Sequence, residues 1–564
     1  MGTGNIPKSV AGVGGFADDR LGAASFLKRN MRKLFPDHWT FLLGEIPLYS
    51  FIVLLLTGVF LTFFFRPTMG EITYDGSYGP LRGVMMSEAY ASTLRISFDV
   101  RGGLLMRQMH HWAALLFVAG MMVHMLRIFF MGAYRKPREL NWVIGVLLLT
   151  LALAEGLTGY SLADDLLSGA ALRITAGVAI SFPVVGTWLT FFLLGGEYPG
   201  EDVISRFYSL HILLIPGVLL ALITAHMILT WVLKHTQMPG KGRTNENVVG
   251  APFYPAFMIK SGAYFMFTFG VTALLGAFAQ INPIWLFGPY TPADISAGSQ
   301  PDFYLGFLEG SLRLMPAWEI NVLGFTLPLS VLIPALLPMG IIMTGLALYP
   351  FIEQWVTGDR REHHVVDRPR NNPHRTSIGV AAITFYGILW LMASNDVIAA
   401  FFHLSLNTLT YIGRVMIFLG PTLAYYITYR ICLGLQRRDA AQIGHGVETG
   451  VIKRRPLGDY IEVHVPPNEG IEALIRGKRP IPTIPAAVED KEGIPANGRH
   501  RRLARLRARM SRIYGGEKVP LHGDQGRDGH RQDGQDGQDG RAAIGSGTDS
   551  GTDSGADEGG RPSP

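Results

Sequence analysis

Five histidines lie inside long apolar stretches of the chain, where titratable side chains are costly and usually functional. His110, His111 and His124 share one stretch, and His211 and His226 share another. The sequence holds a single cysteine, so a metal centre within the chain must use imidazole, thioether or oxygen ligands. Two apolar segments that each carry separated imidazoles therefore indicate metal ligation across the facing helices.

The spacing of these histidines fits helices with aligned side chains. His110 and His124 are 14 positions apart, about 3.9 helical turns, so both point the same way about 21 Å apart along the axis. His211 and His226 are 15 positions apart, which leaves them about 60° out of alignment on an ideal helix. Pro216 lies between them, and a distortion at this proline can absorb the mismatch.

His111 is the alternative to His110 as a ligand. Pairing His111 with His124 spans 13 positions, and the two side chains then diverge by about 140° on an ideal helix. We therefore predict His110 as the ligand and His111 as its neighbour.

Membrane-spanning helices must position these side chains. Of the 564 residues, 48% are hydrophobic and 17% are charged, whereas soluble domains carry about 25% charged residues. A stretch at 166–195, broken by Gly and Pro, predicts short interfacial helices. Stretches of about 20 apolar residues can cross a bilayer, and eight are present, at about 42–65, 109–131, 141–160, 208–233, 258–280, 321–349, 376–394 and 411–434.

The alternation of these spans predicts how the histidines meet. The second and fourth spans are parallel, so His110 lies level with His211 near the outer face, and His124 lies level with His226 near the inner face. Each level offers two imidazoles, which suits the two axial positions of a haem iron. We predict an all-α integral membrane protein of eight transmembrane helices, with a four-helix bundle that holds two non-covalent, bis-histidine b-type haems.

Cations and small residues near the histidines suit the same cofactor. Three arginines within five positions of a predicted ligand are candidates to bind haem propionates: Arg107, Arg127 and Arg206. Anchoring of the span at the cytoplasmic surface also explains Arg127 in part. Room for a flat macrocycle is predicted at Gly44, Gly58 and Gly120, although glycines also serve ordinary packing between membrane helices.

The distribution of Lys and Arg predicts orientation. The basic loops fall on one side of eight spans, which places both termini in the cytoplasm and the chain in the plasma membrane. Basic residues in loops between spans argue against nucleic-acid binding, although the pI is about 9.2.

A basic run at 499–509 predicts a helix on anionic lipid. The predicted divisions are a leader (1–40), the haem bundle (41–235), a second membrane domain (236–435), a polar cytoplasmic extension (436–520) and a disordered tail (521–564).

Over about residues 35–435 the sequence resembles the cytochrome b family of respiratory and photosynthetic cytochrome bc and b6f complexes. The stretches that carry the resemblance are Arg107-Gln108-Met109-His110, His124-Met125-Leu126-Arg127, Arg206-Phe207-Tyr208-Ser209-Leu210-His211, Tyr254-Pro255, Met258-Ile259-Lys260 and Pro301-Asp302-Phe303-Tyr304.

The resemblance implies a quinol-oxidising site at the outer face. In the family this site is lined by a Pro-Glu-Trp-Tyr motif, whose position is held here by Pro301 to Tyr304. Asp302 keeps the carboxylate on a side chain one methylene shorter, so it is the expected proton acceptor. Tyr304 is the expected catalytic partner, and Pro301 and Phe303 are expected to contact the quinol.

The inner quinone site is implied less directly. Lys260 is a candidate, but Ser261 follows it where mitochondrial members carry Asp. His235 is a second candidate, several positions later than the mitochondrial histidine. Elsewhere the sequence has Ala163-Asp164, where members of the cytochrome b family usually carry Pro-Trp. The 15-residue histidine spacing, the eight spans, the Pro-Asp-Phe-Tyr variant and the long tail together resemble actinobacterial members.

That group implies menaquinol as substrate, a Rieske iron–sulfur subunit, a dihaem cytochrome c subunit, association with a terminal oxidase and a dimer of complexes. The expected function is a proton-translocating quinol:cytochrome c oxidoreductase. Two other classes stay open. A secondary transporter would use the buried His and Asp as a proton relay and would carry an internal repeat, and none is evident in the sequence. A haem anchor for a soluble dehydrogenase would lack the outer motif and have fewer spans.

Overall fold

The eight predicted spans are present in the structure, a computed structural model that describes residues 15–16, 18–294, 300–477, 480–485, 498–516 and 519. Within that part of the chain, eight helices are long and apolar enough to cross a membrane. They are η1–α3 (Trp39–Gly44, Glu45–Thr62), α5 (Gly103–Phe130), α6 (Glu139–Ser161), α9–η3–α10 (Val203–Ser209, Leu210–Leu214, Ile215–Val232), η4–α11 (Phe253–Phe257, Met258–Phe278), α14–η6–α15 (Leu329–Ala335, Leu336–Ile342, Met343–Thr357), α16 (Pro373–Met392) and α18 (Leu406–His445).

Several helix bounds differ from the predicted ones by five residues or more, and two of these differences are at the start of the sixth span and the end of the eighth. The sixth span begins at Leu329 instead of about 321, because β5 (Glu319–Val322) and β6 (Phe325–Pro328) form an antiparallel hairpin before it. The turn of this hairpin uses Leu323 and Gly324, both with positive φ. The eighth helix continues from about 434 to His445, because the polar residues after the apolar segment extend the same helix.

The stretch at 166–195 forms two short helices, as predicted. α7 (Leu166–Ile180) and α8 (Gly186–Leu194) have 15 and nine residues, and at 1.5 Å per residue neither reaches the roughly 30 Å of a bilayer core. Asp165 starts α7 by accepting a hydrogen bond from the backbone N–H of Leu167, within a capping box with Ser168. The residue directly after the Ala163-Asp164 variant thus serves as the cap of α7.

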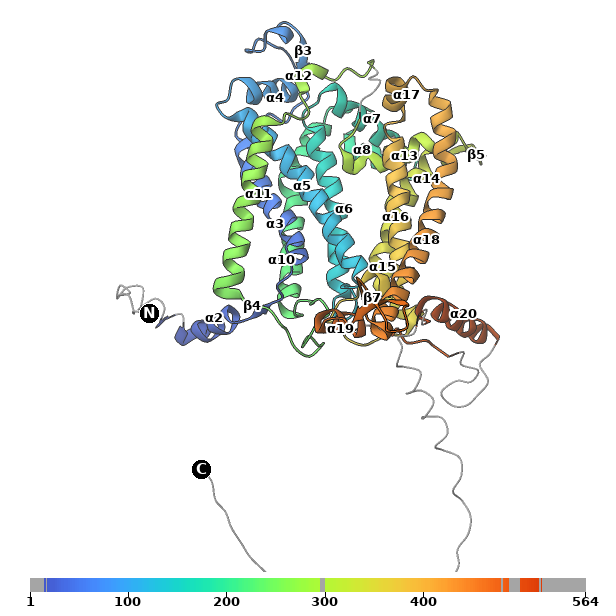
Figure 1. Cartoon of the computed structure of the whole chain (residues 1–564). Coiled ribbons are helices and arrows are strands. Elements are labelled where there is room, and N and C mark those ends of the chain that lie inside the picture. The colour runs from blue at the N-terminus through green and yellow to red at the C-terminus, as the bar shows by residue number, and fades with distance from the viewer. Residues whose placement is uncertain are drawn as a thin grey trace, which may run out of the picture. The chain divides into compact units, whose positions relative to one another are not determined.

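The remaining elements gather at the two ends of the spans (Figure 1). One end carries β2 (Glu71–Thr73), η2 (Gly79–Leu81), β3 (Met85–Ser87), α4 (Glu88–Phe98), α12 (Ile284–Phe287), η5 (Phe303–Leu305), α13 (Gly306–Leu314) and α17 (Asn395–Phe402). The other end carries α2 (Ala23–Met31), β1 (Leu34–Phe35), β4 (Ala251–Pro252), η7 (Pro369–Asn371), β7 (Val447–Arg454), β8 (Tyr460–Val465), α19 (Glu469–Arg476) and α20 (Gly498–Gly515).

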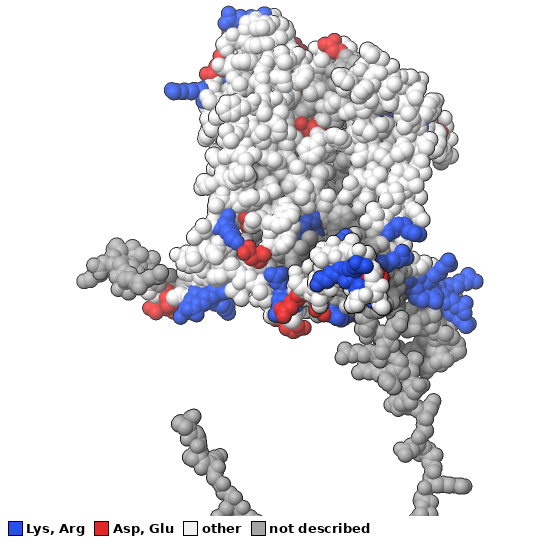
Figure 2. Space-filling view, viewed as in Figure 1, with Lys and Arg blue, Asp and Glu red and all other residues white. Residues whose placement is uncertain are grey.

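Charge separates along the same direction. On the face in view, Lys and Arg gather at the end that carries α2, α19 and α20, whereas the sides of the spans show few charged atoms (Figure 2). An apolar band that ends in a basic surface is the charge pattern of an integral membrane protein.

Helices α3, α5, α6 and α10 pack together as the predicted four-helix bundle. Its core includes Phe51, Phe117, Leu149 and Leu219, all buried. The predicted boundaries at 40, 235, 435 and 520 stay predictions. The disordered tail predicted at 521–564 lies outside the described residues.

Candidate functional site

The four predicted ligands form two facing pairs. The ring centroids of His110 on α5 and His211 on η3 are 6.1 Å apart, and those of His124 and His226 are 6.5 Å apart. Two metal–imidazole bonds of about 2 Å, together with half of each ring, separate such centroids by roughly 6 to 6.5 Å. The separation within each pair therefore matches that of two imidazoles on opposite sides of one metal atom.

A π-helical turn aligns the second pair of ligands. His211 lies in the π-helix Leu210–Leu214, and Pro216 follows at the start of α10. One π turn adds one residue to a helix, so the 15 positions between His211 and His226 act as the 14 between His110 and His124. The predicted distortion is therefore present, and its form is a π turn directly before the proline.

A glycine lies behind each imidazole. A Cβ added to Gly58 would lie 3.3 Å from Cε1 of His110, and one added to Gly44 would lie 2.9 Å from Cε1 of His124. On α6, the corresponding distances are 2.3 Å from Gly159 to Cε1 of His211 and 3.8 Å from Gly145 to Cε1 of His226.

Sequence reasoning identified Gly44 and Gly58 but missed Gly145 and Gly159. Both glycine pairs repeat at 14 positions, the spacing of His110 and His124, and this signal was present in the sequence. Gly120, in contrast, faces Pro47 of α3 and so serves helix packing between α3 and α5.

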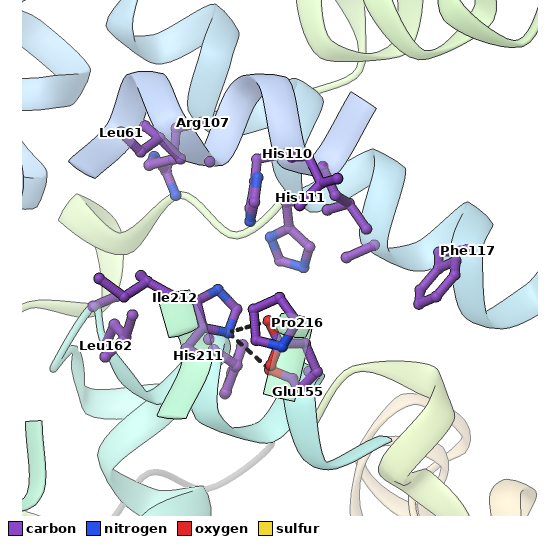
Figure 3. Close-up of a pocket in the computed structure, with 18 of the residues that line it drawn as sticks. Leu61, Arg107, His110, His111, Phe117, Glu155, Leu162, His211, Ile212 and Pro216 are labelled. Carbon is purple, nitrogen blue, oxygen red and sulfur yellow. Dashed lines mark hydrogen bonds and ion pairs between the residues drawn. The ribbon is translucent and has the colours of Figure 1, made fainter. Parts of the chain in front are cut away.

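The outer pair opens into a cavity of about 290 Å³. Figure 3 shows His110, His111 and His211 around this space, with Arg107 and Phe117 from α5 and Glu155 from α6. Nδ1 of His110 lies 2.9 Å from the Thr57 hydroxyl, and Nδ1 of His211 lies 3.1 Å from both the carbonyl oxygen and Oε1 of Glu155. With Nδ1 engaged, Nε2 is the nitrogen left for a metal.

The residues fit haem better than a bare ion. No group of three His, Cys, Asp or Glu side chains converges as a metal site among the described residues. Two imidazoles on opposite sides suit an iron whose other four ligands come from a macrocycle.

The three predicted propionate arginines are placed differently. Arg107 lines the outer cavity. Arg127 is buried over the ring of Phe41, and its Nε and Nη2 have no hydrogen-bond partner among the described residues. Arg206 instead donates to the carbonyl oxygens of Phe191 and Phe192 at 2.8 and 2.7 Å. Arg127 thus keeps two donors for a carboxylate ligand. Both terminal nitrogens of Arg107 make long contacts of 3.4 Å to the carbonyl oxygen of Asn282, and its Nε has no hydrogen-bond partner among the described residues. Arg206 is bound at the end of α8.

Two residues of the outer motif face the same cavity. Asp302 and Tyr304 line it, and the Tyr304 hydroxyl donates to Oδ2 of Asp302 at 2.9 Å. Burial, together with the Asp302 carboxylate, raises the pKa of Tyr304 well above its usual value, so the phenol keeps its proton. Nε2 of His111 lies 3.1 Å from both oxygens of Asp302. His111, interpreted from the sequence only as a neighbour of the ligand, thus contacts the outer carboxylate.

The other motif residues face different surroundings. Pro301 lines a second, largely apolar cavity of about 310 Å³ between α7, α13 and α14. Phe303 packs against Tyr304 and the core. The second cavity also contains Glu309, which is bonded to Arg313. Glu309 was not identified from the sequence, because no motif marks it and only the fold brings it beside Pro301.

The two inner candidates lie on either side of an aromatic cluster. The His235 ring packs on Phe35 at 4.4 Å, and Phe35 stacks on Phe257 at 4.3 Å, just before Lys260. Burial and the nearby Lys33 lower the pKa of His235 to about 4, so the imidazole is neutral at physiological pH. Lys260 donates to Asp37 at 2.7 Å.

Comparisons with known proteins agree with this architecture. A family model described as cytochrome b (N-terminal)/b6/petB matches residues 115–289. A cytochrome bc1 complex cytochrome b subunit of Streptomyces coelicolor is 54% identical over 91% of this chain and 94% of its own length. The corresponding subunit of Mycobacterium leprae is 56% identical over 82% of this chain and 85% of its own length.

The chain belongs to the actinobacterial cytochrome b family. A solved structure titled hyperthermophilic respiratory Complex III also shares the fold, with a TM-score of 0.55 and 20% identity over 73% of this chain and 99% of that one. The predicted family and fold class are confirmed. The protein is an integral membrane cytochrome b, a subunit of the quinol–cytochrome c reductase class of oxidoreductases, and b-type haem is the cofactor of its family.

Proposed function

We propose that this cytochrome b oxidises quinol, in its branch menaquinol, at the outer face and passes electrons through two b haems to an inner quinone site, with coupled proton translocation. Each quinol oxidised releases two electrons and two protons. One electron goes to a Rieske iron–sulfur partner and the other crosses the membrane, so two oxidised quinols supply the two electrons that reduce one inner quinone. The inner quinone takes two protons from the cytoplasm.

The single observation that carries this proposal is the pair of facing histidine sets at opposite depths of one bundle. Their ring separations of 6.1 and 6.5 Å suit bis-histidine ligation at both levels. When bound, the haems supply reversible one-electron transfer, while the protein controls their position and surroundings. His110 with His211 would hold the outer haem, and His124 with His226 the inner haem. Arg107 and Arg127 would bind propionates, and Arg206 is the weaker candidate because its donors are engaged.

Asp302 is the proposed proton acceptor for quinol. Its carboxylate faces the outer cavity and is contacted by the neighbouring Tyr304 hydroxyl and by His111. These two contacts hold the carboxylate in one orientation, which general-base catalysis requires. Pro301 would contact the quinol from the neighbouring apolar cavity, and Phe303, which packs on Tyr304, would support the motif from the core side.

The inner site and the assembly are also proposals. His235, neutral and near the basic end, would accept a hydrogen bond from a hydroxyl of the quinol that forms, and Lys260 would donate one to a carbonyl oxygen of the quinone. The basic end supports a plasma-membrane orientation with both termini in the cytoplasm. A subunit of this class works with Rieske and cytochrome c partners. We also propose that the cytochrome c partner carries two haems, that the complex associates with a terminal oxidase, and that it forms a dimer of complexes.

A haem count on the intact complex tests the proposal. Pyridine haemochrome quantification should give two b haems per chain, and His211→Leu should remove the outer haem while retaining the inner one. His111→Gln is the matched control, because it changes the adjacent imidazole and should keep both haems. Two intact haems in His211→Leu would refute the pairing. A protein without haem would instead favour the transporter, and full haem content with no quinol oxidation would favour the anchor.

A further inference from the structure

The four proposed ligands differ in what contacts their second ring nitrogen. Nδ1 of His211 faces Glu155, with the carbonyl oxygen and Oε1 both at 3.1 Å (Figure 3). Nδ1 of His110 faces the neutral hydroxyl of Thr57, which itself donates to the carbonyl oxygen of Val53 at 2.7 Å and so accepts from the imidazole. Among the described residues, no carboxylate lies within ion-pair distance of His124 or His226. Only one of the four imidazoles has an acidic partner in this part of the chain.

Glu155 itself has no other charged partner. It lies in the membrane helix α6, its side chain is 19% exposed, and no Lys or Arg of the described residues forms an ion pair with it. Its Oε2 has no hydrogen-bond partner in the same part of the chain. An acidic residue in a membrane span without a basic partner is costly and marks a functional position.

Close packing brings the imidazole to this residue. Gly159 lies one helical turn after Glu155, and a side chain there would overlap the His211 ring. The ring therefore packs directly on the backbone of α6, and its Nδ1 reaches the Glu155 oxygens. The absence of a side chain at Gly159 thus makes the contact possible.

We propose that Glu155 is a positioning residue that orients His211 and lowers the reduction potential of the outer haem relative to the inner haem. This inference rests on the proposed assignment of His110 and His211 to one haem. An oxygen that accepts from Nδ1–H makes the imidazole a stronger electron donor through Nε2. Stronger donation favours ferric iron, and hydrogen bonding around a ligand is a recognised control of haem potential. The resulting order of potentials favours electron transfer from the outer level to the inner one.

Redox titration of Glu155→Gln in the intact complex tests the inference. We expect the outer haem of this variant to become easier to reduce by about tenfold in equilibrium constant, which is about 59 mV for one electron. Glu155→Leu, which removes the side-chain acceptor altogether, should shift the potential at least as far. The inner haem serves as an internal control and should not move. Glu88→Gln is the matched control, because Glu88 is a glutamate at the same end of the spans that pairs with Arg66 and lines neither cavity. An outer potential unchanged in both Glu155 variants would overturn the inference.

A measurement on the unsubstituted protein covers the case in which the variants lose the outer haem. The near-infrared magnetic circular dichroism of ferric bis-histidine haem reports how strongly the imidazoles donate. We expect two distinct charge-transfer bands, with the stronger-donor band absent from His211→Leu. Coincident bands would overturn the inference, whereas fewer than two haems per chain would refute the proposed function and not the role of Glu155 alone.

Discussion

At the scale of single residues, the outer site depends on contacts between segments far apart in the sequence. His111 and Asp302 are 191 positions apart, yet Nε2 of His111 lies 3.1 Å from both carboxylate oxygens. The spacing of the histidines was sufficient to prefer His110 over His111 as a ligand. The partner of His111 could not be predicted, because no local period relates α5 to the loop before η5.

Replacing Asp302 with Asn should slow quinol oxidation by about 100-fold, because the amide cannot accept a proton in the reaction. The haem count should not change. Steady-state reduction of the cytochrome c partner by quinol, with haem content measured on the same sample, tests this expectation. Asp164→Asn is the control: Asp164 is also a buried outer carboxylate, but it accepts from Ser87 and should leave the rate unchanged. A full rate in Asp302→Asn would remove Asp302 from the proton path.

At the scale of elements, two helices whose glycines are 14 positions apart face two helices whose histidines are 14 and 15 positions apart. The spans, their order and the interfacial pair α7–α8 followed from apolar length alone. The π turn at Leu210–Leu214 did not, because the 15-residue spacing and Pro216 indicate a distortion without specifying its form. The hairpin β5–β6 was not predicted either, because its apolar residues were assigned to the start of the sixth span.

The close approach of Gly159 on α6 to the His211 ring leads to a prediction for this helix. In Gly159→Ala the new methyl group would lie 2.3 Å from Cε1 of His211, so the imidazole must leave its position. We expect loss of the outer haem with retention of the inner one, measured by difference spectra and pyridine haemochrome. Gly270→Ala on α11 is matched in chemistry and meets no atom within 4 Å, so it should keep both haems. Two haems at normal potentials in Gly159→Ala would show that the ring does not need this close packing.

At the scale of the whole molecule, a buried ion network joins distant parts of the chain at the basic end. Arg375 of α16 is fully buried and donates to Glu353 of α15 at 2.8 Å and to Asp367 at 3.0 Å. Arg135, in the turn between α5 and α6, pairs with the same Asp367 at 2.6 Å. The network therefore connects the haem bundle to the second half of the membrane domain.

The stability supplied by Asp367 should depend on pH. Burial opposes ionisation of this carboxyl, but Arg135 and Arg375 lower its pKa to about 2, against about 3.9 in an unfolded chain. A depressed pKa stabilises the fold above pH 4, and this contribution is lost as the pH falls from about 4 to about 2. Asp367→Asn should thus destabilise the protein by about 2.6 kcal/mol at neutral pH, and the deficit should shrink below pH 4. Thermal unfolding of both forms in detergent across this range measures it. A deficit that does not change with pH would exclude the ionised carboxylate as its cause.

The same network receives the C-terminal extension, which the sequence presented only as a polar segment with a basic helix. Tyr514 of α20 donates to Oε1 of Glu353 at 2.7 Å and lies 2.8 Å from the Tyr349 hydroxyl. The neighbouring Ser511 and Ala508 are buried, whereas Leu503, Leu506 and Ile513 are exposed. The helix is thus attached along one face, and contact of its other face with anionic lipid stays a prediction.

Attachment through Tyr514 can be measured by proteolysis, because α20 is rich in arginine. Tyr514→Phe removes the donor to Glu353 and should weaken docking by about 1 kcal/mol, which corresponds to roughly fivefold more open helix. Trypsin should therefore cleave within 498–516 about five times faster, with unchanged haem content. Tyr460→Phe, at an exposed position of β8, is the matched control and should leave the cleavage rate as it was. Equal cleavage rates in the two variants would mean that α20 is held by its other contacts, such as the hydrogen bond from Arg507 to the carbonyl oxygen of Trp355, and that the buried network at the basic end does not hold this helix.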